Sequence, residues 1–152
     1  MWMTLLVLAA TFGQGYAPAG APQGYERQVF EAVNRTRADA GLPRLAWDDA
    51  IARAARAHSE RMRDARFFAH QDPEFGGIAD RLSRAGIHWA TASENIFQAR
   101  GYSQPAAEAV KAWLASPPHR RNILDRRHTR TGVGIATAPD GTYRFTQIYL
   151  RP

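Results

Sequence analysis

The sequence predicts an α+β fold in which helices cover both faces of a central β-sheet, as a three-layer α-β-α sandwich. Three observations predict it. Apolar residues recur at helical spacing up to about residue 115, and the spacing then changes to the alternation of strands. The last of these strands carries large apolar groups on both faces, so both faces need cover. The chain has 152 residues, 45% of them hydrophobic and 22% charged, which is ordinary for one globular domain.

Four segments carry the apolar spacing or the boundary signals of helices. Asp48 is a favourable N-cap for the second segment, and Pro117 with Pro118 ends the fourth. Ser116 is expected to cap a further short helix that has proline at its first position. The four segments cover residues 25–40, 48–66, 78–84 and 103–115.

The C-terminal segment predicts an antiparallel hairpin in the central sheet. Residues 133–137 alternate in the manner of a strand, residues 139–141 read Pro-Asp-Gly, a turn sequence, and residues 142–150 form the partner strand. Successive side chains on a strand point to opposite faces. One face of the partner strand therefore holds Tyr143, Phe145, Gln147 and Tyr149, and the other holds Arg144, Thr146, Ile148 and Leu150.

The N-terminus has the pattern of a secretory signal peptide. Residues 2–10 are a short apolar run, and Ala17-Pro-Ala19 has the small-residue spacing of a cleavage site. The run is too short to span a bilayer. We expect a signal peptide at 1–19, a linker at 20–24 and one domain at 25–152. The mature protein is then secreted or periplasmic, with no stable membrane insertion. The alternative, an N-terminal strand, is disfavoured by the Gly and Pro residues that follow the run.

Composition limits the chemistry and the partners. The chain has no cysteine, which excludes disulfides, thiolate metal sites and a cysteine nucleophile. It has 20 Lys+Arg against 14 Asp+Glu, for a formal net charge of +6. The arginines are scattered and no nucleic-acid module is visible, so we expect no nucleic-acid partner. A basic exported protein would be drawn to anionic surfaces such as lipid headgroups or cell-wall polymers.

Polar residues that could carry chemistry stand in four separate segments, each with a structural explanation of its own. His58 lies on the apolar stripe of its helix, which is typical of a core histidine. Glu94 could accept backbone N–H bonds in a loop, and Asn95 could fix the same loop. Trp113 falls on the same helical face as Val110 and is expected to anchor the core. The four segments are residues 57–60, 67–70, 93–96 and 113–124.

In this order the segments resemble the CAP superfamily of cysteine-rich secretory proteins, antigen 5 and pathogenesis-related proteins, in its cysteine-free bacterial branch. The resemblance covers nearly all of residues 25–152 and implies an α-β-α sandwich. The family has members that bind sterols, lipids, peptides or proteins, and fold alone does not fix function. The matching residues are Asn34-Arg-Thr-Arg37, Ala40-Gly-Leu-Pro43, Leu45-Ala-Trp-Asp48, Ala54-Ala-Arg-Ala-His58, Met62, Phe68-Ala-His70, Gly86-Ile87, Glu94-Asn-Ile96, Trp113 to Leu124, Gly132-Val-Gly134 and Phe145-Thr-Gln147.

Many eukaryotic members of the family line a cleft with two histidines and two acidic residues. By the resemblance, the first histidine falls on His70 and one acid on Glu94. The position of the second acid holds Ser116, and that of the second histidine holds Arg144. The tetrad is therefore half present, which puts in doubt any mechanism that needs all four groups.

His58 and His119 belong to the bacterial pattern, and either could line the cleft or pack behind it. Two neutral imidazoles, such as His70 and His119, with a carboxylate are an adequate ligand set for Zn²⁺ that leaves a position open for an activated water. Without metal, a histidine beside Glu94 could act as a general base. Ser116 carries the only nearby hydroxyl that is a candidate nucleophile, and no known nucleophile motif accompanies it.

Three functions follow. The favoured one is a non-catalytic binding module, expected to be a monomer, that presents a cleft to a small-molecule, lipid, glycan or peptide ligand of the cell envelope. The second is a metal-assisted hydrolase that uses His70, Glu94 and His119. The third is a polar cluster that only ties loops and helix ends to the sheet.

Overall fold

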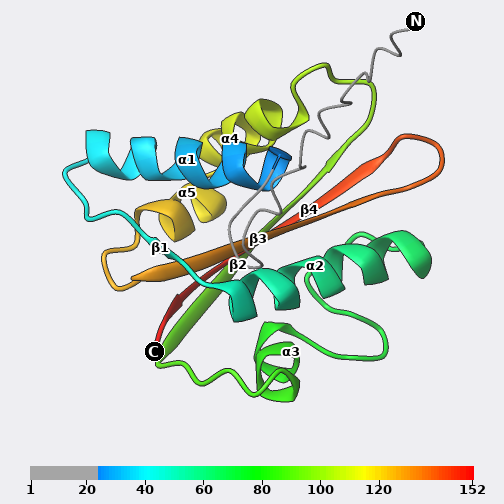
Figure 1. Cartoon of the computed structure of the whole chain (residues 1–152), viewed down its shortest axis with the longest axis horizontal. Helices are drawn as coiled ribbons and strands as arrows, with labels where there is room; N and C mark the ends of the chain where they lie inside the picture. Colours follow the sequence, from blue (N-terminus) through cyan, green and yellow to red (C-terminus); the bar gives the residue numbers. More distant parts are fainter. Residues whose placement is uncertain (1–23) are drawn as a thin grey trace, which may run out of the picture.

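A computed structural model describes residues 24–152, which form five helices around a four-stranded sheet (Figure 1). The predicted signal peptide and nearly all of the predicted linker lie outside the described residues. The elements in chain order are α1 (Gly24–Asp39), β1 (Ala46–Trp47), α2 (Asp49–Asp64), α3 (Ile78–Arg84), β2 (Thr91–Ala99), α4 (Pro105–Ala115), α5 (Pro117–Leu124), β3 (Arg130–Thr137) and β4 (Tyr143–Arg151).

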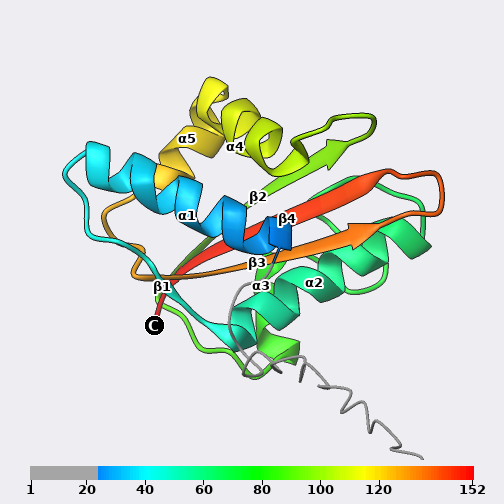
Figure 2. The same ribbon diagram turned by 45° about the horizontal axis from the view of Figure 1, so that its top comes forward.

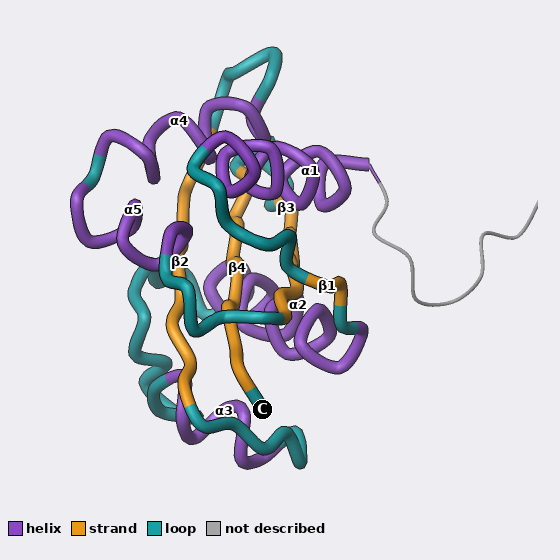
Figure 3. Tube along the Cα trace, turned by 90° about the vertical axis from the view of Figure 1, so that its left-hand side faces the viewer, coloured by secondary structure: helices purple, strands orange, loops and turns teal. Residues whose placement is uncertain are grey.

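The sheet has the strand order β1-β3-β4-β2 and is mixed. β1 pairs with β3 in parallel, whereas β4 is antiparallel to both β3 and β2. The predicted C-terminal hairpin is therefore confirmed as β3–β4. Figure 3 shows β2 at one edge of the sheet with α5 beside it.

Helices cover both faces of the sheet, as the two apolar faces of the last strand predict. α1, α4 and α5 lie on one face and α2 and α3 on the other (Figure 2). We call the α1, α4 and α5 side the first layer and the α2 and α3 side the second layer. Phe145 and Tyr149 of β4 pack into the first layer, and Ile148 and Leu150 pack into the second. Asp48 caps α2 as predicted, because its side chain accepts the first free backbone N–H groups of the helix.

Two glycines allow α2 to lie directly on β3. A Cβ at Gly132 would collide with the backbone of Ala52, and a Cβ at Gly134 would collide with the backbone of Arg56. The helix and strand backbones therefore meet with no side chain between them at these two positions, which is a recognised use of glycine.

Arg37 is buried inside the first layer and joins three segments of backbone. Its guanidinium donates to the carbonyls of Pro43, Ile123, Asp125 and His128 at 2.8–3.3 Å. Burial lowers the pKa of Arg37, but four carbonyl acceptors satisfy the cation. The guanidinium thus fixes the end of α5 and the loop after it onto α1.

Three expectations need correction. Glu94 and Asn95 lie on the edge strand β2, not in a loop. The mixed polar sequence of this strand hid it, because both of its faces make polar contacts, Glu94 with Arg81 on one face and Asn95 with Asn122 on the other. Helix α4 begins at Pro105 with Gln104 at the N-cap position, two residues after the start of the predicted segment 103–115. Ser116 is at the N-cap position of α5, but its side chain makes no cap hydrogen bond.

The exposed edge of β2 is covered by side chains from the helices. Trp113 is buried, as predicted, and its Nε1–H donates to Ile96 O at 2.9 Å. Asn122 Nδ2 donates to Glu94 O at 3.2 Å. Both contacts occupy strand carbonyls that would otherwise be free to pair with another chain.

Candidate functional site

The candidate site lies along β2, where the loop after α2 and the start of α5 meet the strand. The Nδ1–H of His70, in the loop, donates to Glu94 Oε1 of β2 at 2.9 Å. The ring of His119, on α5, lies 6.4 Å from the ring of His70 between centroids. The His70 side chain is 54% exposed and the Glu94 side chain 3%, so a buried carboxylate holds an exposed imidazole in place.

Arg81 of α3 holds the Glu94 carboxylate. Its Nη2 lies 3.0 Å from Oε1 and 2.8 Å from Oε2 of Glu94, and it also donates to His70 O at 3.1 Å. Only 7% of the Arg81 side chain is exposed, so the pair is largely shielded from water. The backbone and the ring of His70 are therefore both fixed by the same buried ion pair. The sequence analysis missed Arg81, because α3 carries two arginines, Arg81 and Arg84, and nothing in so short a helix marks one of them as buried.

His58 lies behind the Glu94 carboxylate in the second layer. It is buried, as the apolar stripe of its helix predicts, with Nε2 at 3.0 Å from Ala69 O and 4.0 Å from Glu94 Oε1. Burial lowers the pKa of His58, and the nearby Glu94 opposes the shift only in part. Neutral His58 donates its Nε2–H to the carbonyl of Ala69, which positions the residue just before His70.

A network of amides fixes the start of α5 against β2. Asn95 Nδ2 donates to His119 O at 3.1 Å and to the Tyr149 hydroxyl at 3.3 Å. Asn122 Nδ2 donates to Asn95 Oδ1 at 2.8 Å. The pKa of His119 is lowered by burial first and by the neighbouring His70 second, which keeps His119 neutral at neutral pH.

The structure groups His70, Glu94 and His119, with His58 directly behind them. Ser116 lies at the junction of α4 and α5, three residues before His119. Arg144 lies on β4 opposite Gln98, four residues along β2 from Glu94. That separation is about 13 Å along a strand. Arg144 Nε and Nη1 are buried and have no hydrogen-bond partner among residues 24–152.

The donor groups do not match a zinc site with three protein ligands. Among residues 24–152, no three His, Cys, Asp or Glu side chains are grouped so that they could hold a metal ion. The Glu94 carboxylate is already bonded to Arg81 and His70, which leaves only the two imidazoles facing outward. Protein zinc sites generally supply three or four ligands.

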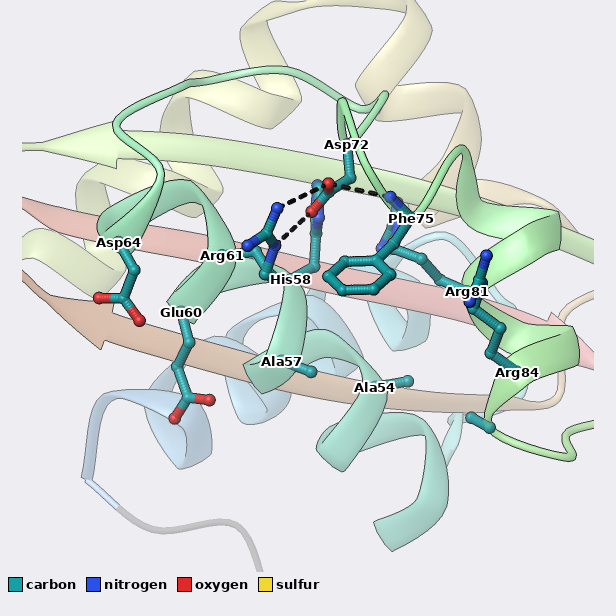
Figure 4. Close-up of a pocket in the computed structure, with 11 residues that line it drawn as sticks. Ala54, Ala57, His58, Glu60, Arg61, Asp64, Asp72, Phe75, Arg81 and Arg84 are labelled. Atoms are coloured by element: carbon teal, nitrogen blue, oxygen red, sulfur yellow. Dashed lines mark hydrogen bonds and ion pairs between the residues drawn. The ribbon is translucent and has the colours of Figure 1, made fainter.

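A cavity of about 420 Å³ lies on the α2–α3 side of the Glu94 cluster (Figure 4). His58 and Arg81 line it and so link it to the candidate site. Figure 4 shows the Phe75 ring between Arg61 and Arg84, whose guanidinium carbons lie 4.6 and 5.5 Å from the ring centroid. The remaining lining residues are Ala54, Ala57, Glu60, Asp64, Asp72 and Ala85.

Similar proteins are found in bacteria. The chain is 43% identical to YkwD of Bacillus subtilis over 110 residues, which is 72% of this chain and 42% of YkwD. It is 36% identical to the membrane protein YlbC of the same organism over 126 residues, 83% of this chain and 34% of YlbC. The chain thus spans well under half the length of these curated relatives.

Solved structures show the same fold. An extracellular protein containing an SCP domain from Bacillus anthracis superposes with a TM-score of 0.74 at 36% identity, over 85% of this chain and 41% of that one. An outer surface protein of Borrelia burgdorferi superposes with a TM-score of 0.75 at 18% identity, over 87% of this chain and 98% of that one. At that identity the second likeness shows the fold alone. Residues 30–149 match the family described as "CAP: Cysteine-rich secretory protein family". The chain therefore belongs to the CAP family of cysteine-rich secretory proteins.

Proposed function

We propose that the chain is an exported, non-catalytic CAP-domain binding module whose His70–His119 face takes a ligand of the envelope or the extracellular space. The observation that carries this proposal is an exposed imidazole, His70, whose ring is fixed by the buried Glu94–Arg81 pair. A polar group held in place before binding loses little conformational entropy when the ligand arrives.

The chemistry of the face favours a ligand that carries hydrogen-bond donors. Because His70 donates its Nδ1–H to Glu94, its other ring nitrogen, Nε2, is left for a ligand. His119 is neutral, for the reasons given above. Hydroxyl or amide groups of a glycan or peptide, or of a lipid headgroup, would match the neutral imidazole of His119 and the free ring nitrogen of His70.

One finding supports an extracellular setting. One relative of known structure, at 36% identity, is described as an extracellular protein. Among the described residues, no helix combines the length and apolarity needed to cross a bilayer.

Binding to a soluble disaccharide-peptide fragment of peptidoglycan is the direct test. Amide shifts in a ¹⁵N NMR titration should cluster around His70 and His119 and should disappear in the His70→Ala/His119→Ala variant. His88→Ala is the matched control, since His88 is exposed in the loop between α3 and β2. No shifts with this fragment or with lipid micelles, or shifts that survive in the double variant, would refute the proposal.

A metal-assisted hydrolase is the second candidate: the chain would supply only two imidazole ligands, His70 and His119, but one contact favours it. The carboxylate–imidazole bond of His70 is the arrangement that fixes the ring of a catalytic or metal-ligating histidine. A calorimetric Zn²⁺ titration of the metal-stripped protein tests it. One equivalent bound tightly by the native chain and not by His70→Ala/His119→Ala would favour the hydrolase, and equal behaviour of the two would remove it.

A further inference from the structure

The cavity between α2 and α3 is lined by buried polar groups that bond to nothing within residues 24–152. Arg81 and His58 both line it, and their side chains are 7% and 0% exposed. Nε and Nη1 of Arg81 and Nδ1 of His58 are buried and have no hydrogen-bond partner among the described residues. Buried polar groups in folded proteins are nearly always paired, with protein, water or a ligand. These three atoms therefore mark the cavity as a site for a polar group from outside the fold.

The three atoms have opposite hydrogen-bonding character. The guanidinium nitrogens of Arg81 can only donate. Because neutral His58 donates its Nε2–H to Ala69 O, its Nδ1 can only accept. A matching ligand carries an acceptor oxygen and an N–H group within a few bonds of each other. The last residue of a peptide has this pair, in its terminal carboxylate and its backbone N–H.

The α3 end of the cavity also carries a positive charge that is left unpaired. Figure 4 shows Arg84 at this end beside Arg81, and Arg84 forms no ion pair within the part of the chain that the structure describes. Arg61 differs, because Asp72 and Glu74 each pair with it at 3.0 Å. An anionic group that enters the cavity therefore finds its free cation at Arg84.

The cavity extends along α2, away from these arginines. Its lining on this helix runs from Ala54 to Asp64, ten residues apart, which is about 15 Å along a helix axis. Ala54 and Ala57 lie between the two ends and leave room beside the Phe75 ring (Figure 4). One amino acid spans about 3.6 Å at most, and three extended residues span about 11 Å. The cavity is therefore long enough for a short peptide.

We propose that this cavity binds the carboxyl-terminal end of a short peptide with small side chains. The terminal carboxylate accepts from Arg81 and pairs with Arg84, and the N–H of the last residue donates to His58 Nδ1. The preceding residues lie along the alanines of α2. A fatty acid has no N–H group and would leave His58 Nδ1 without a donor. The proposal does not rest on the His70–His119 face, because neither of those residues lines the cavity.

Calorimetric titration of the full chain with trialanine tests the proposal, with the C-terminal amide of trialanine and free alanine as comparisons. The amide should bind at least about tenfold more weakly than the acid, because charge-assisted hydrogen bonds to the carboxylate are lost. Arg84→Gln should lower this ratio of affinities about two- to fivefold, since Arg84 is exposed. Arg53→Gln removes an exposed arginine of α2 outside the cavity and should leave the ratio unchanged.

A second pair of variants tests the place of binding. Ala57→Phe should fill the cavity and abolish binding, whereas Ala38→Phe, at an exposed position of α1 in the first layer, should have no effect. Circular dichroism checks that each variant is folded. The proposal is overturned by no binding of trialanine, by equal binding of acid and amide, by an unchanged ratio in Arg84→Gln, or by binding that survives Ala57→Phe. Free alanine binding as tightly as trialanine would replace the peptide with a single amino acid.

Discussion

Replacing Glu94 by glutamine should destabilise the domain by about 3–5 kcal/mol, because glutamine keeps the shape but leaves the Arg81 cation buried without a counter-charge. The two side chains are 3% and 7% exposed, and their closest nitrogen–oxygen distance is 2.8 Å. Arg81→Met leaves the opposite charge, the Glu94 carboxylate, in the same place. The double variant removes both charges and should cost less than the sum of the single changes.

Urea denaturation of the four proteins measures the coupling free energy, because urea is uncharged and does not screen the ion pair. We expect a coupling free energy of about 2 kcal/mol or more between Glu94 and Arg81. That is a large share of the free energy of unfolding of a typical domain, which is about 5–15 kcal/mol. Glu31 and Arg44 provide the matched control. They are 2.9 Å apart, but their side chains are 39% and 53% exposed. Water screens that pair, so its coupling should be at most about 1 kcal/mol.

Equal couplings in the two cycles would refute this reasoning. They would mean that water reaches the Glu94 carboxylate and that burial does not strengthen its pairing with Arg81. The orientation of His70 would then have to come from the loop backbone alone. The Glu94→Gln/Arg81→Met variant keeps His70 but removes the ion pair that orients its ring. If this variant folds, its ligand binding would show whether the orientation of the ring matters or only the presence of the histidine.

Three further predictions test the fold and its electrostatics. Gly134→Ala should lower the free energy of unfolding by about 3 kcal/mol or prevent folding, because α2 would have to move away from β3. Gly77→Ala should lower it by less than about 1 kcal/mol, because the new Cβ meets only the end of a flexible side chain. Chemical denaturation of the two variants compares these losses. The hydrogen-bonded Arg61 guanidinium holds the pKa of Asp72 well below its usual range. The stabilisation from Asp72 is therefore present above about pH 4 and lost as the pH falls further, and Asp72→Asn should flatten that acid-side loss of stability. Partial burial lowers the pKa of His119, so its NMR titration midpoint should lie below that of an exposed histidine; a normal midpoint would show that the surroundings do not desolvate the ring.

Local patterns in the sequence were sufficient for most of the elements. Helix spacing, the Asp48 cap and the Pro-Asp-Gly turn act within a few residues, so they predict α1 to α3 and the β3–β4 hairpin. The two apolar faces of β4 also predict the three layers, since each face must be covered. The ordered motifs identified the family and pointed to His70, Glu94 and His119, which the structure brings together.

Tertiary structure alone decided what surrounds those residues. Arg81 lies 13 residues before Glu94 on a different element, and only the packing of α3 against β2 brings their charges together. Likewise, Asn95 becomes a clamp for α5 only once β2 takes its place at the sheet edge. The physical reason is the range of the interactions. Capping and periodicity act between neighbours in the sequence, whereas burial, and with it the strength of an ion pair, is set by residues that are distant in the chain.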